Sequence, residues 1–136
     1  MPGSFFDTNV LLYVASADVP KADRAEKLIG EGGTISVQVL NEIANVARRK
    51  MRLSWAETRA LLGTFRELLP VRPLTIGVHD AGVALAERYG LSVYDAMIAA
   101  SALDAGCDTL WSADMQDGMV LDGRVRIINP FRAALG

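Results

Sequence analysis

The sequence predicts an α/β fold, a three-layer sandwich in which helices flank a central parallel β-sheet. Short apolar runs typical of buried strands alternate with longer segments whose apolar residues recur at helical spacing. The longer segments are long enough to serve as crossovers between parallel strands. The 136 residues fit one domain, 1–136, with no internal repeat, linker or low-complexity segment.

The same patterns place the individual elements along the chain. Strands are expected at 5–6, 34–36, 71–74, 108–111 and 125–128. Helices are expected after residue 7 and at 20–29, 37–50, 54–68, 78–89 and 96–105. Pro20 and Ser54 are typical of helix starts, and Gly30, Gly90 and Gly106 are typical of helix ends. The 96–105 helix is apolar on nearly every side, which predicts a helix packed in the interior.

Composition limits the classes of protein and the kinds of site. Hydrophobic residues make up 51% and charged residues 22%, which indicates a globular protein rather than a disordered chain. No apolar run is long enough to cross a bilayer, and no signal peptide is recognised, so we expect no membrane contact and a cytoplasmic location. The single Cys107 and single His79 exclude a disulfide and the usual zinc sites. A metal would therefore be held by oxygen, which favours Mg²⁺ or Mn²⁺.

Asp7 stands between the first predicted strand and the helix that follows it. Aspartate is a favoured helix N-cap, which explains the residue without any function. Alternatively, Asp7 lies at the carboxyl end of a strand, where open α/β sheets bind their ligands. Both interpretations remain open for Asp7 taken alone.

Three further acids are expected near the same edge of the sheet. Glu42 lies in the helix after the second strand, Asp95 precedes the interior helix, and Asp114 follows the 108–111 strand. Each has a structural explanation as well, such as the Ser92-x-x-Asp95 capping pattern. Several carboxylates at one edge would repel one another and raise their pKa values unless a cation lay between them. A Mg²⁺ site for phosphodiester hydrolysis follows from such a ligand set.

The residues around these acids resemble the PIN domain family. The resemblance is carried by Phe5-Phe6-Asp7-Thr8-Asn9, by Glu42 in its helix, by Tyr94-Asp95-Ala96 followed by Ile98-Ala99-Ala100, and by Trp111-Ser112-Ala113-Asp114. Length and arrangement, including the final Ile128-Asn129-Pro130-Phe131, are similar to the VapC-type toxins of bacterial and archaeal toxin–antitoxin pairs. The resemblance covers nearly the whole chain.

The resemblance implies an endoribonuclease that depends on Mg²⁺ or Mn²⁺ and uses a metal-activated water. The implied catalytic quartet is Asp7, Glu42, Asp95 and Asp114. Of these, Asp7, Asp95 and Asp114 are the implied metal ligands, and Glu42 and Asp117 are further possible ligands. Gly118 stands where an aromatic residue often follows the last acid, which leaves the role of Asp117 open.

Supporting roles are expected for Thr8, Asn9 and Ser112, the last standing where the family usually has threonine. The resemblance also implies an RNA substrate, a cognate antitoxin protein and a homodimer. RNA phosphates would suit a basic cluster at the end of the helix that bears Glu42, formed by Arg48, Arg49, Lys50 and Arg52. These cations equally suit a helix C-terminus on a solvated surface.

Two other functions are compatible with the predicted fold. The first is an aspartyl-phosphate phosphotransfer domain, of receiver or haloacid-dehalogenase type. Asn9 stands where the dehalogenase pattern requires aspartate, and every lysine lies at or before position 50, whereas these proteins normally use a lysine near the later strands. The second is a PIN-like binding module without catalysis.

Overall fold

The computed structural model describes residues 3–135, so that Met1, Pro2 and Gly136 of the predicted domain lie outside it. The strands are β1 (Ser4–Phe6), β2 (Ile35–Ser36), β3 (Val71–Arg72), β4 (Thr109–Trp111), β5 (Val120–Leu121) and β6 (Val125–Ile128). The helices are α1 (Thr8–Leu12), α2 (Val19–Gly30), α3 (Val37–Arg49), α4 (Trp55–Leu68), α5 (Ile76–Tyr89), α6 (Val93–Asp104) and α7 (Pro130–Leu135). A short 3-10 helix, η1 (Tyr13–Ala15), follows α1.

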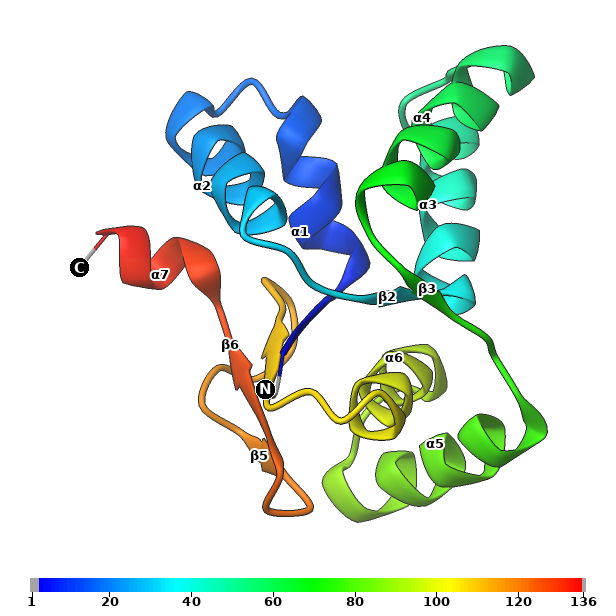
Figure 1. Cartoon of the computed structure of the whole chain (residues 1–136), viewed down its shortest axis with the longest axis vertical. Helices are drawn as coiled ribbons and strands as arrows, with labels where there is room; N and C mark the ends of the chain where they lie inside the picture. Colours follow the sequence, from blue (N-terminus) through cyan, green and yellow to red (C-terminus); the bar gives the residue numbers. More distant parts are fainter. Residues whose placement is uncertain (1–2, 136) are drawn as a thin grey trace.

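The strands form a four-stranded sheet in the order β1-β4-β6-β5 and a separate pair, β2-β3. Pairing is parallel between β1 and β4, between β4 and β6, and between β2 and β3. A single parallel bridge between Phe5 and Thr34 connects the two sheets, and Figure 1 shows β2 and β3 beyond β1. The parallel pairing brings the carboxyl ends of β1 and β4 to the same edge.

The predicted parallel sheet is confirmed for β1, β4 and β6, but the outer edge of the observed sheet differs from the prediction. β5 was not predicted, and it pairs with β6 in the antiparallel sense. Asp122 and Gly123 connect the two strands with φ of 50° and 67°, the positive values that a tight hairpin turn requires. An Asp-Gly pair between apolar runs is a strong hairpin signal that was available in the sequence.

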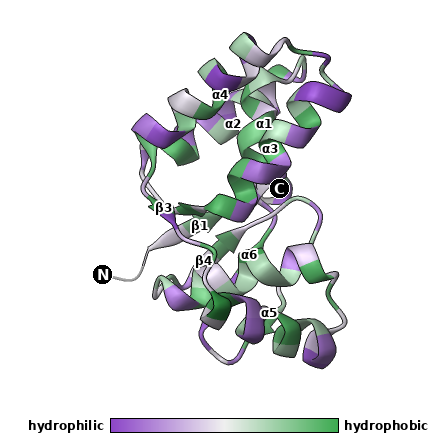
Figure 2. Ribbon diagram, turned by 90° about the vertical axis from the view of Figure 1, so that its right-hand side faces the viewer, coloured by the Kyte–Doolittle hydropathy of each residue, from purple (hydrophilic) through white to green (hydrophobic). Residues whose placement is uncertain are grey.

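Helices cover the sheet on both sides. α5 packs along α6 on one side, α2 and α7 pack together on the other, and α3 and α4 form a helical hairpin that extends past β2 and β3 (Figure 1). The predicted interior helix is confirmed, because every residue from Ala96 to Ala102 is buried. Figure 2 shows hydrophilic residues on the outer surfaces of α4 and α5 and on the helices beside α4. None of the helices in residues 3–135 has the length and apolar character needed to cross a membrane.

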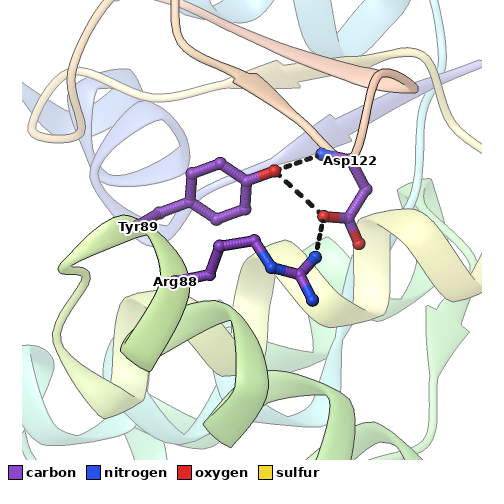
Figure 3. Close-up of polar contacts among 3 residues, drawn as sticks. All are labelled: Arg88, Tyr89 and Asp122. Atoms are coloured by element: carbon purple, nitrogen blue, oxygen red, sulfur yellow. Dashed lines mark hydrogen bonds and ion pairs between the residues drawn. The ribbon is translucent and has the colours of Figure 1, made fainter.

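The β5–β6 turn is fixed to the end of α5. The hydroxyl of Tyr89 donates to Asp122 Oδ1 at 2.9 Å and accepts from the Asp122 amide at 2.8 Å (Figure 3). Arg88 forms an ion pair with the same carboxylate oxygen. These contacts lie beside the sheet edge formed by β5 and hold the antiparallel hairpin against the α5–α6 layer.

Candidate active site

Asp7 directly follows the buried residue Phe6 at the end of β1 and is itself 3% exposed. Its backbone is extended, with φ −75° and ψ 157°, and its Oδ1 accepts from the Thr8 amide at 2.7 Å. The N-cap interpretation of Asp7 is therefore confirmed. The second carboxylate oxygen faces other partners, so that capping does not prevent Asp7 from serving a site.

Ser112 connects the end of β4 to Asp7. Its hydroxyl donates to Asp7 Oδ2 at 2.8 Å and accepts from the amides of Asp114 at 3.3 Å and Met115 at 3.0 Å. Asn9 adds a second connection, because its side chain donates to Asp7 Oδ2 at 3.4 Å and accepts from the Ala113 amide at 3.1 Å. Both side chains thus hold the loop that bears Asp114 against the end of β1.

Glu42 reaches the same region from α3, where it is half-buried. Its two carboxylate oxygens accept from the Thr8 hydroxyl at 3.1 Å and from Gln38 Nε2 at 3.0 Å. Thr8, Asn9 and Ser112 therefore all contact an acid of the predicted quartet. Gln38 was not predicted, although its position four residues before Glu42 on one helix face was a signal in the sequence.

The four predicted acids line one pocket of about 230 Å³. Asp7 and Asp114 come from the ends of β1 and β4, Glu42 comes from α3, and Asp95 comes from the first turn of α6. Lys50, at the C-cap of α3, is also a lining residue. Four separate segments thus bring carboxylates to one place.

The electrostatics of the pocket favour a bound cation. Burial, together with the charges of Asp95 and Glu42, raises the pKa of Asp7 to about 7, although the hydrogen bonds from Ser112 and Thr8 lower it. Burial, together with the charge of Asp114, also raises the pKa of Asp95. A divalent ion among these carboxylates would offset both the desolvation and the mutual repulsion.

The donor set fits a hard divalent ion, because carboxylate oxygens are the ligands that Mg²⁺ and Mn²⁺ prefer. Within residues 3–135, however, no three acidic, histidine or cysteine side chains are close enough together to form a ready metal-binding group. Mg²⁺ commonly binds one or two carboxylates directly and keeps several waters. The pocket suits an ion held partly through water better than one enclosed by protein ligands.

Comparison with known proteins assigns the family. Residues 4–116 match the family model of the PIN domain. The chain belongs to the PIN domain family. A search of curated proteins gave no match to the sequence of this PIN domain.

Solved structures similar to this PIN domain include VapC, VapBC and toxin–antitoxin proteins. A DNA-bound VapBC from Salmonella typhimurium has a TM-score of 0.71 at 20% identity, covering 96% of this chain and 99% of that one. A chain of a toxin–antitoxin complex from Klebsiella pneumoniae has a TM-score of 0.69 at 22% identity, covering 93% and 97%. VapC20 of Mycobacterium tuberculosis, described as a sarcin-ricin loop cleaving toxin, has a TM-score of 0.65 at 16% identity, covering 82% and 91%. These likenesses confirm the predicted fold.

Asp117 of this PIN domain lies apart from the acidic pocket. Its carboxylate accepts from the Asn129 amide at 2.7 Å, and Arg132 approaches the other oxygen at 3.9 Å. Asp117 is absent from the lining of the pocket that contains the four predicted acids. Its observed contacts hold the 112–118 loop against the start of α7.

The predicted basic cluster of the PIN domain separates into different environments. Arg48 donates to the Leu53 carbonyl at 2.7 Å and stacks over the Trp55 ring at 4.3 Å, so that it connects α3 to α4. Arg49 is exposed, and Arg52 occupies the turn between the helices with φ of 56°. Lys50 is the member of the cluster that lines the acidic pocket.

Proposed function

We propose that this PIN domain is a Mg²⁺- or Mn²⁺-dependent endoribonuclease and the toxin of a VapC-type toxin–antitoxin pair. The observation that carries the proposal is the meeting of Asp7, Glu42, Asp95 and Asp114 around one pocket from four separate segments. The raised pKa of the buried Asp7 indicates a site that gains from a cation. Membership of the PIN family and the likeness to VapC20 support RNA as the substrate.

Asp7, Asp95 and Asp114 would hold the ion, and Glu42 is close enough to the same pocket to assist. The ion, when bound, would activate water for attack on a phosphodiester and offset charge on the phosphate. The protein itself supplies orientation. Ser112 and the Thr8 amide fix the two oxygens of Asp7.

Glu42 is held in place in the same way by hydrogen bonds from Thr8 and Gln38. Both of its carboxylate oxygens accept hydrogen bonds, so the side chain has a fixed orientation in the pocket that also contains Asp7. This arrangement suits a group that orients the attacking water or receives its proton. Lys50 at the pocket edge supplies positive charge for the RNA phosphate.

The proposed partners follow from the family and its structural relatives. Similar chains were solved in toxin–antitoxin complexes, which supports a cognate antitoxin for this protein. The homodimer and the cytoplasmic location belong to the same proposal. Size-exclusion chromatography with light scattering would measure the oligomeric state directly.

The activity is tested by removing one negative charge at a time. Asp7→Asn and Asp95→Asn keep the side-chain shape and should each reduce cleavage of pooled RNA by at least about 100-fold, because a ligand charge is lost. Cleavage is followed with Mg²⁺, with Mn²⁺ and with chelator, and the cut ends are sequenced. Asp80→Asn, an exposed acid on α5, is the matched control and should cleave like the wild type.

Equal cleavage by the wild type and both pocket variants would refute the proposed mechanism. If the wild type binds Mn²⁺ but leaves every RNA in the pool intact, the binding-module alternative is favoured instead. Phosphate trapped covalently on Asp7 would favour the phosphotransfer alternative.

A further inference from the structure

A second cavity, of about 540 Å³, adjoins the acidic pocket on the side formed by α3 and the start of α6. Glu42, Val46 and Asp95 line both spaces, so the two lie side by side. The volume lies within the range of about 300–1,000 Å³ common for small-molecule sites. A polymer bound at the acids would therefore have its neighbouring units beside this cavity.

One wall of the cavity is a row of amide side chains on α3. Gln38, Asn41 and Asn45 are spaced at i, i+3 and i+7, which places them on one helix face. Gln38 is buried and engaged with Glu42, whereas Asn41 and Asn45 are exposed. The two asparagines thus present amide donors and acceptors to the space beside the acids.

The facing wall carries an exposed aromatic ring. Tyr94 lies in the first turn of α6, directly before Asp95, and is 67% exposed. Ser92, the N-cap of the same helix, adds a hydroxyl to this wall. A flat apolar ring with so much exposed surface at the mouth of a cavity is suited to stacking against another flat group.

The chemistry of the lining favours a neutral ligand. Apart from the two acids shared with the neighbouring pocket, the described lining residues are uncharged, and no lysine or arginine is among them. A phosphate group would find no counter-charge there. A nucleobase fits both walls. It has a flat face that can stack on the aromatic ring and an edge that side-chain amides can bind.

We propose that this cavity binds one base of a single-stranded RNA, next to the phosphate that is cleaved. Tyr94 stacks on the base, and Asn41 and Asn45 bind its edge, which makes them specificity-determining residues. A base inside a duplex is covered on both faces and has its edge paired, so only an unpaired base could make these contacts. The inference rests on the proposed ribonuclease function and adds the residues that bind one base of the substrate.

The stacking role of Tyr94 is tested by measuring KM and kcat of its variants. The substrate is a single-stranded RNA oligonucleotide that carries a cut site found by sequencing. Tyr94→Ala should raise KM about tenfold or more, the effect expected when one stacked base is lost, with a smaller change in kcat. Tyr94→Phe keeps the ring and should retain the wild-type KM. Val93→Ala, which truncates the half-exposed neighbouring side chain outside the cavity, is the control.

The asparagines are tested by base preference. Asn41→Ala and Asn45→Ala should weaken or change the preferred base at one position beside the cut, as read from sequenced ends. Loss of a preference that is present in the wild type supports the assignment. An unchanged preference in both variants, together with an unchanged KM for Tyr94→Ala, overturns it. A change in oligomeric state on Tyr94→Ala also overturns it, because the face would then be an interface between copies.

Measuring RNA binding without cleavage distinguishes failure of this inference from failure of the proposed function. Fluorescently labelled single-stranded and duplex RNA are titrated into the wild type and Tyr94→Ala with Mn²⁺ present. If the wild type cleaves nothing but binds single strands more tightly than Tyr94→Ala does, the cavity assignment stands and the ribonuclease proposal fails. If the wild type neither binds nor cleaves single-stranded RNA, both fail.

Discussion

At Asp7, burial and hydrogen bonding have opposite effects on one carboxylate. Burial raises its pKa to about 7, although Ser112 and the Thr8 amide both donate to it and lower the pKa. The same residue caps α1 and belongs to the acidic pocket. One side chain therefore serves local structure through one oxygen and the site through the other.

The raised pKa of Asp7 predicts how the stability of the metal-free protein depends on pH. The folded state binds the proton more tightly than the unfolded chain does, whose aspartate has a pKa near 3.8. The contribution of Asp7 is thus fully present below pH 3.8 and is lost as the pH rises to about 7. The free energy of unfolding should fall by about 4 kcal/mol in all over this range, since one unit of pKa difference is worth about 1.4 kcal/mol.

Urea unfolding in the presence of chelator at pH 5, 6 and 7 measures this slope. Asp7→Asn cannot titrate and should flatten the curve, whereas Asp80→Asn should leave the slope as in the wild type. An unchanged slope in Asp7→Asn would show that other groups cause the pH dependence.

At the scale of elements, Gly33 allows β1 and the segment before β2 to approach closely. A Cβ at this position would overlap the ring of Phe6 and lie 3.0 Å from the Ser4 carbonyl oxygen. Phe6 is fully buried and directly precedes Asp7. The absence of a side chain at Gly33 therefore affects both the core and the position of the acid.

Gly33→Ala should reduce the free energy of unfolding by about 1–3 kcal/mol, because the core beside it has no space for a methyl group. Gly30→Ala is the matched control, since a Cβ there would meet no atom within 4 Å. The control should be neutral or slightly stabilising, because alanine is the better helix former. Equal stability of the two variants in urea unfolding would contradict the argument.

Most elements could be predicted because their signals are local. Ser54, expected at a helix start, forms a capping box with Glu57 at the beginning of α4, and Gly90 ends α5 with φ of 70°. β5 and α7 were missed for different reasons. β5 has only two residues, and α7, which begins at Pro130, is a short helix after the last predicted strand. Pro is well suited to the first position of a helix.

At the scale of the whole molecule, the pocket predicts that metal binding stabilises the fold. An ion that binds only the folded protein adds about 2.7 kcal/mol at a free concentration 100 times its Kd. Saturating Mn²⁺ should therefore raise Tm by several degrees in the wild type and in Asp80→Asn. Asp7→Asn and Asp95→Asn should lose most of this increase.

Differential scanning fluorimetry with and without chelator measures the change in Tm. The same increase in the pocket variants as in the wild type would show that the ion binds elsewhere. No increase in the wild type at millimolar Mn²⁺ would contradict the proposed metal site.

Sequence patterns were sufficient for the fold class, for most helix boundaries and for the four acids that line the pocket. These signals depend on residue type and on spacing over a few positions, and both can be read along the chain. The contacts that give the acids their properties depend on long-range packing. Ser112 and Asp7 are 105 positions apart, and their hydrogen bond exists because β1 and β4 pair in parallel with Phe6 beside Trp111.

The same reason explains the remaining differences between prediction and structure. Spacing alone did not separate Asp114, which lines the pocket, from Asp117, which accepts from Asn129. Spacing also did not show which member of the basic cluster lines the pocket. Among the described residues of that cluster, only Lys50 does so. Strand register and burial decide which of these residues line the pocket, and burial also raises the pKa of Asp7. Register and burial arise only when distant segments pack together.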